Sequence, residues 1–210
     1  MSLSTFAVHG TGKRFRLHCV AGFCASILFS SAVPAHDGHK AAPASPRERA
    51  AQIFFSDRPL VTQHGQHVRF FSDVLKDKVV LVSFLFTECA DSCPLQAQKM
   101  AAVQSLLAGW TGNVVRLVSI SVDPDRDRPE VLREYASRFQ AGPGWFFLTG
   151  KKTDIDDVIR RLGHAAPARE AHTSLFLLGN SRTGKWLKLD PDTAAVEIAE
   201  RLRELAADAS

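Results

Sequence analysis

The chain lacks the features that mark several large classes of protein. It has no stripe of lysine and arginine with interleaved aromatic residues, so the sequence indicates no nucleic-acid partner. Residues 1–35 contain three basic residues and no acidic one. Without those three, the 26 basic residues fall to 23, which nearly balance the 22 acidic residues. No internal repeat is visible, and 210 residues with 45% hydrophobic content suit one domain with its own core.

Cysteine is scarce, and two of the four cysteines fall in the first 24 residues. They lie in an apolar run, 17–33, that follows a basic segment, 13–16, and ends in small or compact residues at 33–35. This pattern predicts an export signal over 1–35. An uncleaved membrane anchor is the alternative, since about 17 apolar residues are at the lower limit of what spans a bilayer. Both predict a periplasmic domain, soluble or anchored to the inner membrane, in a compartment where disulfides can form.

The next segment, 36–58, is predicted to be a flexible linker because an Ala/Pro/Ser stretch dominates its first part. Cleavage after Ala35 would make His36 the new N-terminus. Its free amine, together with the imidazoles of His36 and His39, could then bind Cu(II), although a solvated polar tail accounts for the same residues. The remainder, 59–210, is predicted to form the domain.

Strands and helices alternate from residue 59 onward. Segments 60–62 and 67–71 predict a hairpin, and the almost wholly apolar segment 79–86 predicts a central strand covered on both faces. Pro94 is expected to open a helix that turns Leu95, Met100, Val103 and Leu106-Leu107 toward the core. The later elements are expected to be strands at 114–122, 145–148, 174–178 and 186–189, and helices from 129, over 154–162 and over 193–206. This order predicts an α/β protein of thioredoxin-like fold, a central mixed β-sheet flanked by helices with an N-terminal β-hairpin extension.

The remaining two cysteines lie in the segment Thr87-Glu88-Cys89-Ala90-Asp91-Ser92-Cys93-Pro94. Cys89 is expected in the loop at the carboxyl edge of the central strand, where sites in open α/β sheets gather, and Cys93 just before the helix. Backbone N–H groups and the helix dipole there are expected to favour thiolate. A structural disulfide is disfavoured because such a short loop removes little unfolded-state entropy. A thiol–disulfide redox pair and a copper site with two soft donors both fit these residues.

A third ligand would separate these interpretations. His172 directly precedes the apolar segment 174–178, and in a thioredoxin-like fold that junction lies beside the cysteine loop. An imidazole there would complete a site of two sulfurs and one nitrogen, whereas the plain alternative is a surface histidine. The residues alone leave the choice open.

Four segments match one known family. Residues 87–94 resemble the motif T-x-C-P-x-x-C-P, and residues 118–130 resemble a segment S-V-D-P-E-R-D-T-P-E. Residues 142–150 resemble the strand that follows, and His172-Thr173-Ser174 falls where the family has D-H-S or D-H-T. Over residues 59–206 the sequence therefore resembles the Sco/SenC family of copper chaperones for cytochrome c oxidase assembly.

The resemblance implies a thioredoxin-like fold and copper, Cu(I) or Cu(II), held by Cys89, Cys93 and His172, with a Cys89–Cys93 disulfide when oxidised. It implies a periplasmic metallochaperone, rather than an enzyme, that delivers copper to the dinuclear centre in the copper-bearing subunit of cytochrome c oxidase. A periplasmic thiol reductant or copper donor would be a further partner, and only an N-terminal anchor would contact the membrane. The alternative function is a thiol-disulfide oxidoreductase that reduces cysteines of that subunit or of another exported protein.

Two positions depart from the family pattern. Ala90 replaces the proline that usually follows the first cysteine, and Ala171 replaces the aspartate that usually precedes the histidine. An aspartate there would orient the imidazole, so its loss bears on copper affinity more than on the ligand set. Asp123 and Asp127 lie in the S-V-D-P segment and could lie near the site, since the segment 114–122 ends at the same sheet edge. The favoured expectation is structural, with Asp127 capping the helix that begins near Pro129.

Overall fold

The structure is a computed structural model that describes residues 45–90, 92–164 and 175–208. The predicted signal or anchor, His36, His39 and His172 with its neighbours lie outside the described residues. Within the described ranges, no helix is long and apolar enough to cross a membrane.

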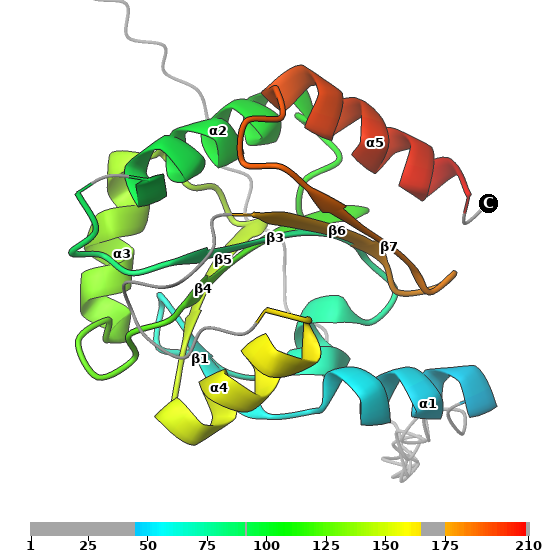
Figure 1. Cartoon of the computed structure of the whole chain (residues 1–210), viewed down its shortest axis with the longest axis horizontal. Coiled ribbons are helices and arrows are strands. Elements are labelled where there is room, and N and C mark those ends of the chain that lie inside the picture. The colour runs from blue at the N-terminus through cyan, green and yellow to red at the C-terminus, as the bar shows by residue number, and fades with distance from the viewer. Residues whose placement is uncertain (1–44, 91, 165–174, 209–210) are drawn as a thin grey trace, which may run out of the picture. The chain divides into compact units, whose positions relative to one another are not determined.

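One mixed sheet organises the domain. The elements in chain order are α1 (Pro46–Phe55), β1 (Pro59–Thr62), β2 (His67–Arg69), the π-helical turn η1 (Phe70–Leu75), β3 (Val79–Leu85), α2 (Ser92–Leu106), β4 (Val115–Ser121), α3 (Pro129–Arg138), β5 (Trp145–Thr149), α4 (Lys152–Arg161), β6 (Phe176–Asn180), β7 (Lys185–Leu189) and α5 (Ala195–Ala207). The seven strands lie in the order β2-β1-β5-β4-β3-β6-β7. Strands β3, β4 and β5 run parallel, and the remaining pairs are antiparallel. The predicted fold class, including the N-terminal hairpin β1–β2, is confirmed (Figure 1).

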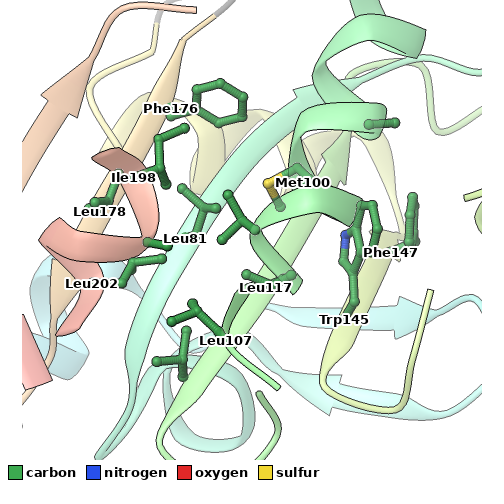
Figure 2. Packing of buried hydrophobic residues seen from close by; sticks show 14 of the residues in the cluster. Leu81, Met100, Leu107, Leu117, Trp145, Phe147, Phe176, Leu178, Ile198 and Leu202 are labelled. Carbon is green, nitrogen blue, oxygen red and sulfur yellow. The ribbon is translucent and has the colours of Figure 1, made fainter. Parts of the chain in front are cut away.

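Strand β3 explains why segment 79–86 is so apolar. All seven of its residues are buried, because helices cover both faces of the sheet. Leu81 belongs to the core beneath α2, α3 and α5, and its neighbour Val82 belongs to the core beneath α1, η1 and α4. Figure 2 shows the first of these cores, in which Leu81 and Leu117 of the sheet face Met100 of α2 and Leu202 of α5.

The linker prediction is wrong over residues 46–55, which form helix α1. Ser45 caps this helix, with the backbone N–H of Glu48 donating to its Oγ over 3.1 Å, and Pro46 occupies the first turn. The same Ala, Pro and Ser residues that suggested a linker therefore include a cap and a helix start. Because Phe55 is buried in the core, the domain begins at α1 rather than at residue 59.

Two further boundaries differ from the prediction. The second hairpin strand ends at Arg69, because the next six residues turn into η1 and bury Phe70 and Phe71. Helix α2 begins at Ser92, two residues before Pro94, so Cys93 lies within its first turn.

The residues that α2 buries also differ from the prediction. Cys93, Ala97, Met100, Val103 and Leu107 are buried at helical spacing. Leu95 and Leu106, which were expected in the core, are exposed instead.

Leu81→Ala will test the importance of the central strand. Leu81 is fully buried, so truncation will lower the free energy of unfolding by about 2–5 kcal/mol. Leu95→Ala is the matched control, because the same atoms are removed from a side chain that is 65% exposed. Urea unfolding should show a clear drop for Leu81→Ala and almost none for Leu95→Ala. Equal effects would contradict the burial described for β3 and α2.

Candidate metal centre

Both cysteines of the predicted site lie at the carboxyl edge of β3. The chain turns directly after the strand, where the backbone N–H of Cys89 donates to the carbonyl of Phe86 over 3.2 Å. The backbone N–H of Cys93 then donates to Sγ of Cys89 over 3.5 Å. Cys89 is partly exposed, whereas Cys93 is only 1% exposed, and both pack against the core beneath α2. Cys89 therefore lies partly exposed in the loop before α2, and Cys93 lies buried in the first turn of that helix.

Burial dominates the acid–base behaviour of Cys93. Desolvation, together with the hydrogen bond that links it to Cys89, raises the pKa of the Cys93 thiol to about 12. The expectation that the helix terminus would favour thiolate is thus wrong for Cys93, because the desolvation of a buried sulfur outweighs the helix dipole. Without metal, Cys93 is a thiol at neutral pH, and an ion that binds its sulfur must displace the proton.

A buried carboxylate holds the start of the cysteine loop. Asp127 is almost fully buried and accepts hydrogen bonds from Thr87 and Ser121. The Oγ1 of Thr87 donates to its Oδ1 over 2.6 Å, and the backbone N–H of Thr87 donates to the same oxygen over 3.2 Å. Ser121 Oγ donates to the other oxygen over 2.6 Å. Asp127 therefore links the carboxyl ends of β3 and β4. Its partner Thr87 lies two residues before Cys89, so the link holds the start of the cysteine loop.

The cap predicted for Asp127 is wrong. The residue before α3 is Arg128, whose side chain makes no capping hydrogen bond, and Asp127 points instead into the sheet edge. Burial raises the pKa of the Asp127 carboxyl above its ordinary value, against the hydrogen bonds from Ser121 and Thr87, which lower it. The alternative expectation, that Asp127 lies near the site, is the better one, since Thr87 and Asp127 follow two neighbouring parallel strands.

Gln96 was not singled out from the sequence. It is buried one helical turn after Cys93, and its side-chain amide lies between the carbonyl of Phe84, 3.2 Å away, and the N–H of Leu175, 3.3 Å away. The amide can donate to the first and accept from the second. This pair of bonds joins the cysteine-bearing helix to the residue at which the described chain resumes before β6. A polar residue on an otherwise apolar helix face was the only available sequence signal.

The described residues bring together two of the three predicted ligands. Within 45–90, 92–164 and 175–208, no group of three His, Cys, Asp or Glu side chains could hold a metal ion. His172 lies outside these ranges, as does Asp91. The two sulfurs alone form a soft donor set of the kind that suits monovalent copper.

Comparison with known proteins decides the family. The SCO1/SenC family model matches residues 46–207. The chain belongs to the SCO1/SenC family. The resemblance seen in the sequence is thereby confirmed, and the match begins at α1, which supports placing the start of the domain there.

Individual relatives agree with this assignment. The SCO2-like protein RP587 of Rickettsia prowazekii is 38% identical over 99 residues, which are 47% of this chain and 46% of that protein. The structure of Bradyrhizobium japonicum ScoI with copper bound is 28% identical, with a TM-score of 0.60, and covers 71% of this chain and 98% of its own. BsSco is described as a member of the Sco family of cytochrome c oxidase assembly proteins with a disulfide switch. It is 26% identical, with a TM-score of 0.60, and covers 71% of this chain and 91% of its own. These structures confirm the thioredoxin-like fold. Over the aligned residues, the chain spans about half the length of the first curated relatives it matches.

Asp127→Asn will test the tie between the two loops. The amide replaces one acceptor oxygen with a donor that faces hydroxyl and N–H donors, so the free energy of unfolding should fall by about 1–3 kcal/mol. Cys89 should also react faster with a thiol reagent, because Thr87 no longer holds the loop. Asp125→Asn, at an exposed position two residues away, is the control and should change neither measurement. Wild-type Cys89 reactivity in Asp127→Asn would contradict the positioning role.

Proposed function

We propose that this Sco/SenC protein is a periplasmic copper chaperone that holds copper with Cys89, Cys93 and His172. It delivers the metal to the dinuclear copper centre of cytochrome c oxidase. The observation that carries the proposal is the pair of sulfurs at one sheet edge, with Leu175 beside the same helix turn. The copper-bound ScoI and the oxidase-assembly role stated for BsSco support the cargo and the target. The basic-then-apolar N-terminus supports export.

The position of Leu175 supports His172 as the third ligand. Leu175 N–H lies 3.3 Å from the amide of Gln96, which follows Cys93 by one helical turn. Leu175 follows His172 by three positions, and each step along the chain spans at most about 3.8 Å. A chain of this length can bring the imidazole of His172 to the two sulfurs, which supports its choice as the third ligand. An imidazole nitrogen added to two thiolates gives a site that accepts Cu(I) and also permits Cu(II).

The unequal exposure of the two sulfurs suits a metal that must be passed on. Cys93 is the inner donor, fixed in the core by α2, and Cys89 is the outer donor. A partner's thiolate can enter from the Cys89 side as this protein's ligands leave one at a time. Oxidation to the Cys89–Cys93 disulfide removes two electrons and two protons and takes away both sulfur donors. A thiol reductant must return those electrons before copper can bind again.

Copper titration of the reduced protein will test the three-ligand site. We expect one copper per chain, with Cys89→Ser and Cys93→Ser each abolishing tight binding. His172→Ala should weaken binding by at least tenfold and change the spectrum of the Cu(II) form, because a nitrogen donor is lost. His64→Ala, which removes an exposed hairpin histidine, is the matched control. Binding that is unaffected by His172→Ala would refute the three-ligand site.

The apparent affinity for Cu(I) will depend on pH. With its pKa near 12, Cys93 carries a proton throughout the neutral range, and copper must release it. This one displaced proton makes the apparent affinity rise about tenfold for each pH unit between about 6 and 9, beyond any contribution from Cys89. Titrations against a competing Cu(I) chelator at several pH values measure the slope. A pH-independent affinity would contradict a buried thiol at position 93.

A thiol–disulfide reductase is the second candidate. A partly exposed Cys89 beside a buried Cys93 resembles an attacking and a resolving thiol, and this asymmetry is the observation that favours it. The reductase needs both cysteines but not His172. If His172→Ala retains oxidase assembly in cells while either cysteine variant loses it, the reductase explains the function better than the chaperone does.

A further inference from the structure

A second feature of the domain lies on the other side of the sheet from α2. A groove of about 520 Å³ runs between α1, α4 and β7, and it is lined mainly by apolar side chains, including Phe54, Leu162, Trp186 and Leu187. None of its lining residues belongs to the cysteine loop or to the loop that carries Asp127. The copper site therefore does not explain it.

Helix α1 turns one stripe of residues toward this groove. Arg47, Ala50, Ala51 and Phe54 line it at the spacing i, i+3, i+4 and i+7, which is one face of a helix. Phe54 is nevertheless 61% exposed, and the neighbouring Ile53 is 75% exposed. The apolar surface thus continues past the groove onto the outside of the helix. A small ligand inside the groove would leave that outer part uncovered.

The charged side chains among the described residues that line the groove all have one sign. Its charged lining residues in the described part of the chain are Arg47, Arg161 and Lys188, with no acidic side chain among them. Arg161 is paired with Asp157 at 3.0 Å. Arg47 and Lys188 donate only to backbone carbonyls, those of Arg182 at 3.5 Å and Gly163 at 3.1 Å, and neither has a carboxylate partner within the described ranges. Two cations that have no carboxylate partner among the described residues, set beside an apolar groove, complement an anionic amphiphile.

We propose that this face, formed by α1, the end of α4 and β7, docks onto an anionic membrane surface. A lipid acyl chain occupies the groove, Ile53 and Phe54 enter the interface beside it, and Arg47 and Lys188 bind anionic headgroups. The place of α1 in the chain favours a bilayer over a soluble fatty acid. The helix begins at residue 46, and only twelve residues lie between it and the apolar segment 17–33 that is expected to engage the membrane during export. This docking does not depend on copper, and it leaves Cys89 accessible.

Trp186 lines the groove and provides a local reporter. The chain has three tryptophans, of which Trp145 is fully buried and Trp110 is remote from the groove lining. The full chain carrying Trp110→Phe would be mixed with vesicles that contain phosphatidylcholine with brominated acyl chains. One set contains no anionic lipid, and the other contains roughly a third phosphatidylglycerol. Because the N-terminal segment is itself basic and is present in every variant, the comparison between variants on the anionic vesicles reports how the domain sits on the surface.

We expect bromine to quench Trp186 on the anionic vesicles and much less on the neutral ones. Arg47→Gln with Lys188→Gln should weaken docking about 25-fold, since each basic residue contributes about fivefold at an anionic surface. Arg133→Gln with Arg203→Gln removes the same charge from the helices on the opposite face of the sheet, and it should leave quenching nearly unchanged. Trp186→Phe should remove the signal. An unchanged far-UV circular dichroism spectrum and an unchanged urea midpoint show that each variant is folded.

Several outcomes would overturn the docking proposal. The first is equal quenching of Trp186 on neutral and anionic vesicles. The second is quenching that persists in the Arg47→Gln, Lys188→Gln variant. The third is quenching that falls as much in the Arg133→Gln, Arg203→Gln control as in that variant. Quenching by a soluble brominated fatty acid, with none from vesicles, would show instead that the groove binds a free small amphiphile.

Discussion

The site depends on the hydrogen bonds that the Asp127 carboxylate accepts from Thr87 and Ser121. Strands β3 and β4 run parallel, so their carboxyl ends meet at one edge and their following loops emerge side by side. Parallel pairing alone does not set the paths of those loops. Asp127 joins them by accepting from both sides, and it does so inside the core, where an unsatisfied donor would be costly. The cysteine loop therefore begins from a fixed point even though Ala90 lacks the ring of the proline usual in the family.

The opposition between burial and the helix terminus at Cys93 shapes the chemistry that follows. A helix start favours an anion, but the sulfur of Cys93 is so far from solvent that the thiol form prevails. In the chaperone that we propose, copper supplies the positive charge that makes the buried thiolate favourable, so loading is linked to proton release. Unloading returns the proton, and this lowers the cost of losing the metal. A buried inner donor with a high pKa is therefore compatible with transfer, whereas two exposed thiolates would lack this protonation step.

The sequence predicted the fold well because the sheet is strongly patterned. A run such as 79–86 can hardly be anything but a central strand, and the β-α-β order limits how the neighbouring strands are arranged. The predictions that were wrong concern residue types that are typical of two different local structures. Ser45 and Pro46 are as typical of a linker as of a helix start, and only the burial of Phe55 distinguishes the two. Asp127 has the position of a helix cap in the chain, yet its partners are Thr87, in the loop after β3, and Ser121, the last residue of β4. Gln96 could not be predicted, because its role depends on a contact with Leu175, 79 residues later in the sequence.

The two faces of the sheet have different roles in the domain. Helices α2, α3 and α5 enclose the core that holds Cys93, and any movement there would change the geometry of the donors. Helix α1 packs on the other core through Phe55. Neither Gln96 nor Asp127 bonds to this helix, so the outer surface of α1 takes no part in positioning the sulfurs. A contact made through α1 can therefore orient the domain without disturbing the sulfurs. For a protein that passes a metal from an exposed thiolate, separating the surface that docks from the edge that transfers keeps Cys89 open to a partner.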